Sequence, residues 1–176
     1  MNQEKFQSIG TLLALVISII ALFTSIYEAN IMKSQQQALV WPYFEVVPSF
    51  SGEGFKFVAY NNGTGPAIIK SVEVRYKGHV IKSIDALLDA IKVDRVIGYD
   101  RLRISSLNNS VYKAGEERAI LHMPWDEETR EMAKDMGNVS IKVQYESVLG
   151  DFWLYDSEGK KHLKGEQFKS ELEFEN

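Results

Sequence analysis

Residues 9–27 read IGTLLALVISIIALFTSIY, a run of nineteen residues without a charged side chain, a proline or a histidine. As an α-helix this run is about 28 Å long, close to the roughly 30 Å hydrocarbon core of a bilayer. A helix satisfies its own backbone hydrogen bonds, which lipid requires of any segment that crosses it. The sequence therefore predicts a transmembrane helix over residues 9–29, preceded by a short tail, residues 1–8.

Two other interpretations of the run are weaker. A cleaved signal peptide has a shorter apolar stretch and small residues before the cut. The best candidate site here, Tyr27-Glu28-Ala29, begins with a bulky tyrosine. A buried core helix is disfavoured because no charged side chain divides the run into two faces. The favoured interpretation is an uncleaved signal anchor that makes the chain a single-pass membrane protein.

Small residues recur along the run at spacings of four, four, three and four, which places them on one narrow side of the helix. They form the small-residue stripe, Gly10, Ala14, Ser18, Ala21 and Ser25. Small side chains at this spacing let two helix backbones approach closely, and serine hydroxyls can bond between helices. The stripe predicts a packing face for self-association, although these residue types also occur together in membrane helices by chance.

The flanking charges determine the orientation of the helix only weakly. Lys5 precedes the run and Lys33 follows it, so the count of positive residues is even. The terminal amine and the short leading tail favour an N-terminus inside and an extracytoplasmic domain. The opposite orientation, with the domain in the cytosol, is the main rival.

Composition limits what the remaining residues, about 150 and enough for one domain, can do. The net charge is −4 and the isoelectric point is near 5.5, so no basic surface is available and we expect no nucleic-acid partner. The chain has no cysteine, which excludes disulfides, thiolate metal sites and cysteine nucleophiles. An extracellular eukaryotic domain of this size usually carries a disulfide, so a bacterial origin is favoured.

Periodicity changes from helical to twofold at Pro42. Residues 30–41 contain good helix formers and predict a helical stem or linker that ends near Trp41, because proline disfavours helix in its predecessor. In residues 42–156, short runs rich in β-branched and aromatic residues alternate with polar positions and are separated by glycine-containing turns. This pattern predicts a mainly β domain, an antiparallel sandwich or barrel.

Two short helices are expected within this domain. Ile84, Leu87, Leu88 and Ile91 follow helical spacing behind Ser83, which can cap the helix. Asp126 can cap the second helix, and Gly137 can end it. Both helices are expected to cover an open end or edge of a sheet.

The run Asn61-Asn62-Gly63-Thr64-Gly65-Pro66-Ala67 is a turn between two predicted strands, since Asn and Gly tolerate positive φ and Pro66 blocks helix. A strand, this run, and an alternating strand that ends in Lys77-Gly78 resemble bacterial immunoglobulin-like β-sandwich modules. Such modules occur in adhesion-related surface proteins and in uncharacterised single-pass membrane proteins. The resemblance implies an immunoglobulin-like fold and a role in binding, whereas the two helices depart from the simple module.

No sequence pattern indicates catalysis. His79, His122 and His162 stand alone, without the i, i+4 partner of a zinc site. There is no Gly-x-Ser-x-Gly elbow and no phosphate-binding glycine loop. We therefore expect a non-enzymatic protein without metal or cofactor, and the rival from another class is an envelope enzyme with acids brought together by the fold.

The segment Gly150 to Asp156 is the best candidate for a partner contact. Alternation places Trp153 and Tyr155 on one face of a strand, and aromatic residues dominate contact hot spots. The simpler interpretation is a central strand buried on both sides.

Residues 157–176 are strongly charged and predict a hairpin or tail in which Phe168, Leu172 and Phe174 are the few apolar residues near the end. The short alternation Leu172-Glu173-Phe174-Glu175 predicts either an added edge strand or a segment that frays or holds a partner. Taken together, the sequence predicts a membrane-anchored binding or scaffold subunit in contact with the lipid bilayer. Its expected partner is another protein or a second copy of the chain.

Overall fold

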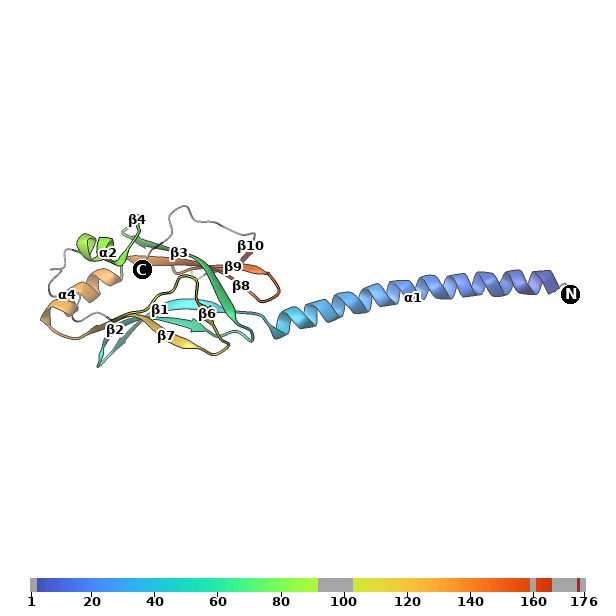
Figure 1. Cartoon of the computed structure of the whole chain (residues 1–176), viewed down its shortest axis with the longest axis horizontal. Coiled ribbons are helices and arrows are strands. Elements are labelled where there is room, and N and C mark those ends of the chain that lie inside the picture. The colour runs from blue at the N-terminus through green and yellow to red at the C-terminus, as the bar shows by residue number, and fades with distance from the viewer. Residues whose placement is uncertain (1–2, 92–102, 159–160, 166–173, 175–176) are drawn as a thin grey trace. The chain divides into compact units, whose positions relative to one another are not determined.

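The computed structural model describes residues 3–91, 103–158, 161–165 and 174 (Figure 1). The chain divides into two compact units, Met1–Leu39 and Val40–Asn176. We call the second one the β unit. Each unit is described by itself.

The first unit is one long helix, α1 (Gln3–Leu39). From Phe6 to Leu39 it is long and apolar enough to cross a membrane, and none of its most apolar stretch is buried. The expected long apolar N-terminal helix is therefore confirmed. It ends three residues before Pro42, whose ring disfavours helix in the residue that precedes it.

The β unit contains two antiparallel sheets. In the first sheet, the strand order is β1 (Phe44–Ser51), β2 (Gly54–Asn61), β7 (Glu117–Pro124) and β5 (Arg103–Ile104). In the second, the order is β10 (Lys161–Gly165), β9 (Phe152–Asp156), β8 (Val139–Glu146), β3 (Ala67–Tyr76) and β4 (His79–Ile81). A two-residue strand, β6 (Val111–Tyr112), also pairs with β3.

The sheets form two layers around a shared core (Figure 1). Phe44 of β1 contacts the ring of Tyr145 on β8, with ring centroids 5.7 Å apart. The Tyr155 hydroxyl donates a hydrogen bond of 2.6 Å to the Val46 carbonyl oxygen, which also joins the two sheets. Apolar side chains from both layers therefore exclude water together, which is the main stabilising contribution in such a fold.

A register shift in β3 keeps its apolar residues in this core. Pairing with β8 slips between Ile69 and Ser71, so Lys70 is an extra residue on the β3 side. Ile69 and Val72, three positions apart, consequently both face inward and are buried. Strict alternation from Val72 alone would have placed Ile69 on the opposite face.

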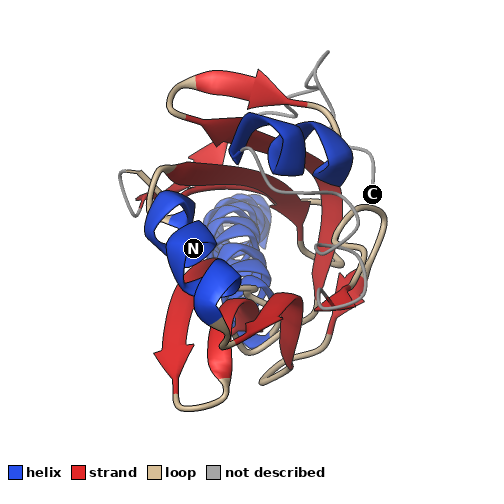
Figure 2. Cartoon of the chain, turned by 90° about the vertical axis from the view of Figure 1, so that its left-hand side faces the viewer, coloured by secondary structure: helices blue, strands red, loops and turns tan. Residues whose placement is uncertain are grey.

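Two described helices lie against the sheets (Figure 2). α2 (Ile84–Ile91) buries Leu87, Leu88 and Ile91, the face predicted from helical spacing. α4 (Glu127–Met136) begins at Asp126, whose side chain accepts from the Thr129 backbone while the Thr129 hydroxyl accepts from the Asp126 backbone. Both helices and the antiparallel sheets confirm the expectation in outline, and the chain as a whole mixes helix and strand rather than being mainly β.

Burial of Tyr145 predicts a loss of stability at alkaline pH. Burial raises the pKa of its phenol from 10.0 to about 12. Between about pH 10 and 12 the unfolded chain releases this proton while the folded chain retains it, so stability falls by about 2–3 kcal/mol. Urea unfolding of the Tyr145→Phe variant should fall less steeply with pH in this range than that of the natural chain. An identical slope in both chains would contradict this assignment.

Candidate functional site

The candidate site is the end of the β unit at which the chain arrives from α1. Three segments lie there: the junction segment Val40–Tyr43, the turn Asn61–Pro66 and the turn Ser147–Asp151. We call this region the junction end. Its backbone is held rigidly, and it carries exposed apolar side chains.

Asn61 joins three chain segments, which are the junction segment, the turn that contains Asn61 itself, and residues 112–113. Its side chain is fully buried and takes part in five hydrogen bonds. The amide nitrogen donates to three carbonyl oxygens, and the amide oxygen accepts from two backbone N–H groups. The three carbonyls belong to Gly65 (2.8 Å), Tyr112 (2.9 Å) and Lys113 (3.1 Å), and the two N–H groups belong to Tyr43 and Gly63 (both 3.2 Å). Every hydrogen-bonding position of this buried amide is therefore occupied, as burial requires.

The glycines of the same turn allow a close backbone approach. The Trp41 carbonyl oxygen accepts from the N–H groups of Thr64 (2.8 Å) and Gly65 (3.2 Å). A Cβ on Gly65 would lie 2.3 Å from the Val40 carbonyl oxygen, and one on Gly63 would lie 2.3 Å from that of Trp41. Only glycine fits at either position without displacing the junction segment.

Aromatic rings gather on this scaffold as the junction cluster, which consists of Trp41, Tyr43 and Trp153. The Trp41 ring lies 5.6 Å from that of Tyr43 and 6.1 Å from that of Trp153, centroid to centroid. Trp41 remains 41% exposed although its backbone is fixed. A rigid, half-exposed indole of this kind presents contact area at little entropic cost.

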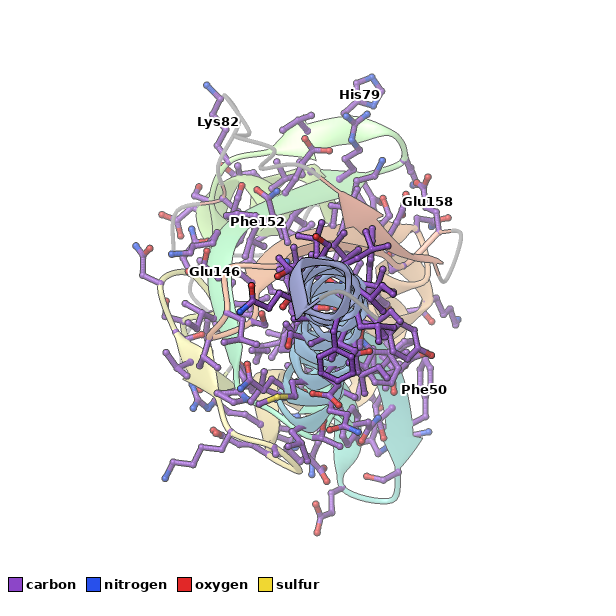
Figure 3. All side chains as sticks on the ribbon, turned by 90° about the vertical axis from the view of Figure 1, so that its right-hand side faces the viewer. Phe50, His79, Lys82, Glu146, Phe152 and Glu158 are labelled. Atoms are coloured by element: carbon purple, nitrogen blue, oxygen red, sulfur yellow. The ribbon has the colours of Figure 1, made fainter. Side chains whose placement is uncertain are left out.

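Two more exposed apolar residues lie at the tip of the neighbouring hairpin. Val148 is 52% exposed and Leu149 is 51% exposed. The Ser147 hydroxyl accepts from the N–H groups of Leu149 and Asp151, which orders the turn. Figure 3 labels Glu146 and Phe152, the residue pair that closes this hairpin.

The two predicted contact residues have different environments. Tyr155 is 3% exposed and belongs to the core, bonded to Val46. Trp153 is half-buried and reaches the junction cluster. The structure therefore brings Trp153, but not Tyr155, to the surface of the junction end.

The small-residue stripe lies in the first unit, on α1. All five of its residues are exposed on the helix, within about 80° of arc at 3.6 residues per turn. The Ser18 hydroxyl donates a hydrogen bond of 2.8 Å to the Ala14 carbonyl oxygen, so in this arrangement it is bonded within its own helix. Nothing lies within 4 Å of a Cβ added to Gly10, which leaves that position open to a neighbouring helix.

Charged groups of the β unit form surface pairs. Hydrogen bonding to Lys56 lowers the pKa of Glu53, and hydrogen bonding to the Lys113 backbone and to Arg118 lowers that of Glu116. Within the described ranges, no group of three or more histidine, aspartate and glutamate side chains is placed to hold a metal ion. His79 lies on an exposed hairpin (Figure 3), away from β7, which carries His122.

Sequence reasoning missed three features of this region. It assigned Asn61 to a turn without anticipating a buried amide, because three of the five partners, Tyr43, Tyr112 and Lys113, come from distant segments. It overlooked Val148 and Leu149, although two apolar residues next to a Gly-Asp turn are a visible signal. It left open whether the tail around Phe174 adds an edge strand or frays, and it did not predict that this ring lies in the core, where it is 7% exposed.

No protein-family model, curated protein or solved structure matches this chain.

Proposed function

We propose that this chain is a single-pass membrane protein that presents an immunoglobulin-like β-sandwich as a non-enzymatic binding or scaffold subunit. Its domain lies outside the cytoplasm, and its copies associate through the stripe on α1. The observation that carries the proposal is α1 itself. A helix whose most apolar stretch is entirely exposed is unstable in water, and a bilayer supplies the missing apolar surroundings.

Strand order supports the immunoglobulin-like assignment. In such domains strands A, B, E and D form one sheet, and C, F and G form the other, with C′ added beside C. Strands A, B and C then correspond to β1, β2 and β3, and C′ corresponds to β4. Strands D, E, F and G correspond to β5, β7, β8 and β9, and this assignment gives the observed neighbours in both sheets. Strands β6 and β10 and helices α2 and α4 are additions to that plan.

The stem is long enough to pass through the headgroup layer. Twelve residues of α1, Glu28–Leu39, follow the apolar run and extend about 18 Å as a helix. One headgroup layer is about 5–8 Å thick. A stem of this length supports the proposal that Trp41 contacts protein rather than lipid.

The junction end is the proposed contact surface. Trp41, Val148 and Leu149 are exposed on segments that Asn61 and Ser147 hold in place through hydrogen bonds. Preordered apolar side chains lose little entropy when a partner covers them.

Leucine substitutions in the stripe test self-association. Gly10→Leu and Ala14→Leu should each weaken dimerisation by about 1–2 kcal/mol, or five- to thirty-fold, because the larger side chains keep the backbones apart. A reporter assay for helix association in a bacterial inner membrane measures this effect.

Control substitutions change side-chain size on the opposite side of the same helix. Leu12→Ala and Val16→Ala lie off the stripe and should leave the reporter signal unchanged. Equal losses from stripe and control variants would mean that α1 does not associate through this face.

The orientation is tested separately, because a cytosol-facing sensor or accessory subunit is the main alternative. A reporter fused after Asn176 should be active outside the cytoplasm, and added protease should remove it from intact spheroplasts. Activity only in the cytosol would show that the domain faces the cytosol, and the membrane anchor would remain part of the proposal.

The other alternative is an acid-dependent envelope enzyme. Such an enzyme would require a carboxyl group with a raised pKa, whereas the pKa shifts of Glu53 and Glu116 are downward.

A further inference from the structure

Phe174, close to the C-terminus, is built into the core of the β unit. Its side chain is only 7% exposed. Its N–H donates to the Val72 carbonyl oxygen at 2.9 Å, and its own carbonyl oxygen accepts from the Asn108 side-chain amide. A residue near the end of the chain thus has the backbone pairing and burial of a strand residue.

The hydrogen bond to Val72 fills a gap along the outer edge of β3. The first residues of β3, Ala67 and Ile68, pair with β6, and the Ile69 N–H donates to the Ser110 carbonyl oxygen. The last residues, Val74 to Tyr76, pair with β4. Phe174 occupies the position between them, so this edge is completed by three separate pieces of chain.

An apolar pocket lies directly beside this position. Phe174 is one of its walls, and a cavity of about 50 Å³ remains between the side chains. The other walls include Phe57, Val72, Leu107, Leu121 and Ile141. All five are buried core residues, so withdrawing the Phe174 ring would expose a pocket that accepts an aromatic side chain.

We propose that the β3 edge and this pocket form a groove for an extended C-terminal peptide. Phe174 fills the groove of its own chain and is exchangeable with Phe174 of a second copy. Recognition combines main-chain pairing to Val72, the Asn108 amide on a peptide carbonyl, and an aromatic ring in the pocket. These are the components by which sheets accept an added strand.

A second copy is the occupant that the geometry favours. The groove fits this chain's own sequence, and the tail of another copy carries the same residues. Exchange of an identical segment between copies reproduces the contacts that Phe174 already makes within one chain, so it needs no new recognition surface. The inference concerns only the β unit and does not depend on the proposed membrane role.

A labelled peptide of residues 166–176, EQFKSELEFEN, tests the groove directly. The acceptors are two chains that retain α1 and are held in nanodiscs, one ending at Gly165 and one of full length carrying Phe174→Ser. The peptide should bind both acceptors saturably in fluorescence anisotropy. A Phe174→Ser peptide should bind at least tenfold more weakly, and the intact chain, whose groove is filled, should also bind at least tenfold more weakly.

Matched variants of the acceptor locate the contact. Asn108→Ala should weaken peptide binding several-fold, because the carbonyl of residue 174 loses its donor. Asn62→Ala, the same substitution at an exposed asparagine of the junction end, should leave binding unchanged.

Exchange between copies is then measured with a photoreactive phenylalanine analogue at position 174. After co-reconstitution with an excess of tagged acceptor that ends at Gly165, illumination should link the two chains near Val72 or Asn108. No peptide binding to either acceptor, with circular dichroism showing both folded, would overturn the groove. Peptide binding together with purely intramolecular links would overturn exchange between copies. Neither result depends on the stripe, so this inference and self-association through α1 can fail separately.

Discussion

Replacing Asn61 by alanine should destabilise the β unit by about 3–5 kcal/mol, one of the two largest effects expected in this chain. The substitution removes the amide that pairs three carbonyl oxygens and two backbone N–H groups, of which those of Tyr43, Gly63 and Lys113 are only partly buried. Each unsatisfied buried group costs about 1–3 kcal/mol, and the total stays near the low end because the Lys113 carbonyl keeps the Glu116 N–H as a donor and water can reach the partly buried groups. Urea unfolding of the full chain in mild detergent, followed by tryptophan fluorescence, measures the loss.

The adjacent asparagine provides a matched control. Asn62 is exposed, and its amide donates to the Glu45 carboxylate at 2.7 Å on the surface. Asn62→Ala should change stability by less than about 1 kcal/mol, because solvent replaces such a contact. Similar losses from both variants would show that Asn61 does not organise the junction.

The second large effect is expected at Gly65. In Gly65→Ala, the added methyl would lie 2.3 Å from the Val40 carbonyl oxygen and 2.5 Å from the Val40 Cα. Backbone atoms cannot swing aside like the end of a long side chain, so the junction segment must move. Crowding of this kind typically costs about 1–3 kcal/mol and occasionally more, and we expect about 2–4 kcal/mol because two Trp41 hydrogen bonds are strained as well.

Gly52 in the β1–β2 hairpin is the control for this substitution. No atom lies within 4 Å of a Cβ placed there, and its φ is outside the left-handed region. Gly52→Ala should therefore fall within about 0.5 kcal/mol of the natural chain, or stabilise it slightly by restricting the unfolded state. The account of the junction is wrong if Gly65→Ala unfolds at the same urea concentration as Gly52→Ala.

The regular elements were predictable where a single period governs burial. Val72, Val74 and Tyr76 alternate along β3, and the alternation from Val139 to Tyr145 predicted β8, because both strands lie in a sheet with one face in the core. Helix α2 was predictable for the same reason, since its buried residues follow the helical period. Local sequence carries this information without knowledge of the partner segments.

Features that depend on distant segments were not predictable. The extra residue Lys70 shifts the inward face of β3 only because β8 pairs on both sides of it. The two residues of β6, Val111 and Tyr112, are too few to show a period. Phe174 is buried because β3 has a gap in its edge, and the short alternation around Phe174 allows an edge strand without identifying which edge it joins.

The candidate site was partly predictable. Helical spacing places the stripe from Gly10 to Ser25 on one side of α1, although it does not identify what covers that side. Strand alternation correctly placed Trp153 and Tyr155 on a common face. It could not show that Tyr155 lies under Val46 while Trp153 lies beside Trp41, because depth depends on the opposite sheet.

Membrane fractionation tests the central claim most directly. The full, uncleaved chain should remain in the high-speed pellet after an alkaline carbonate wash, and a chain that starts at Val40 should appear in the supernatant. Both bands are read with an antibody against a C-terminal tag, and the mass of the full chain confirms that α1 is retained. Recovery of the intact chain in the supernatant would contradict a membrane-spanning α1 and, with it, the proposed function.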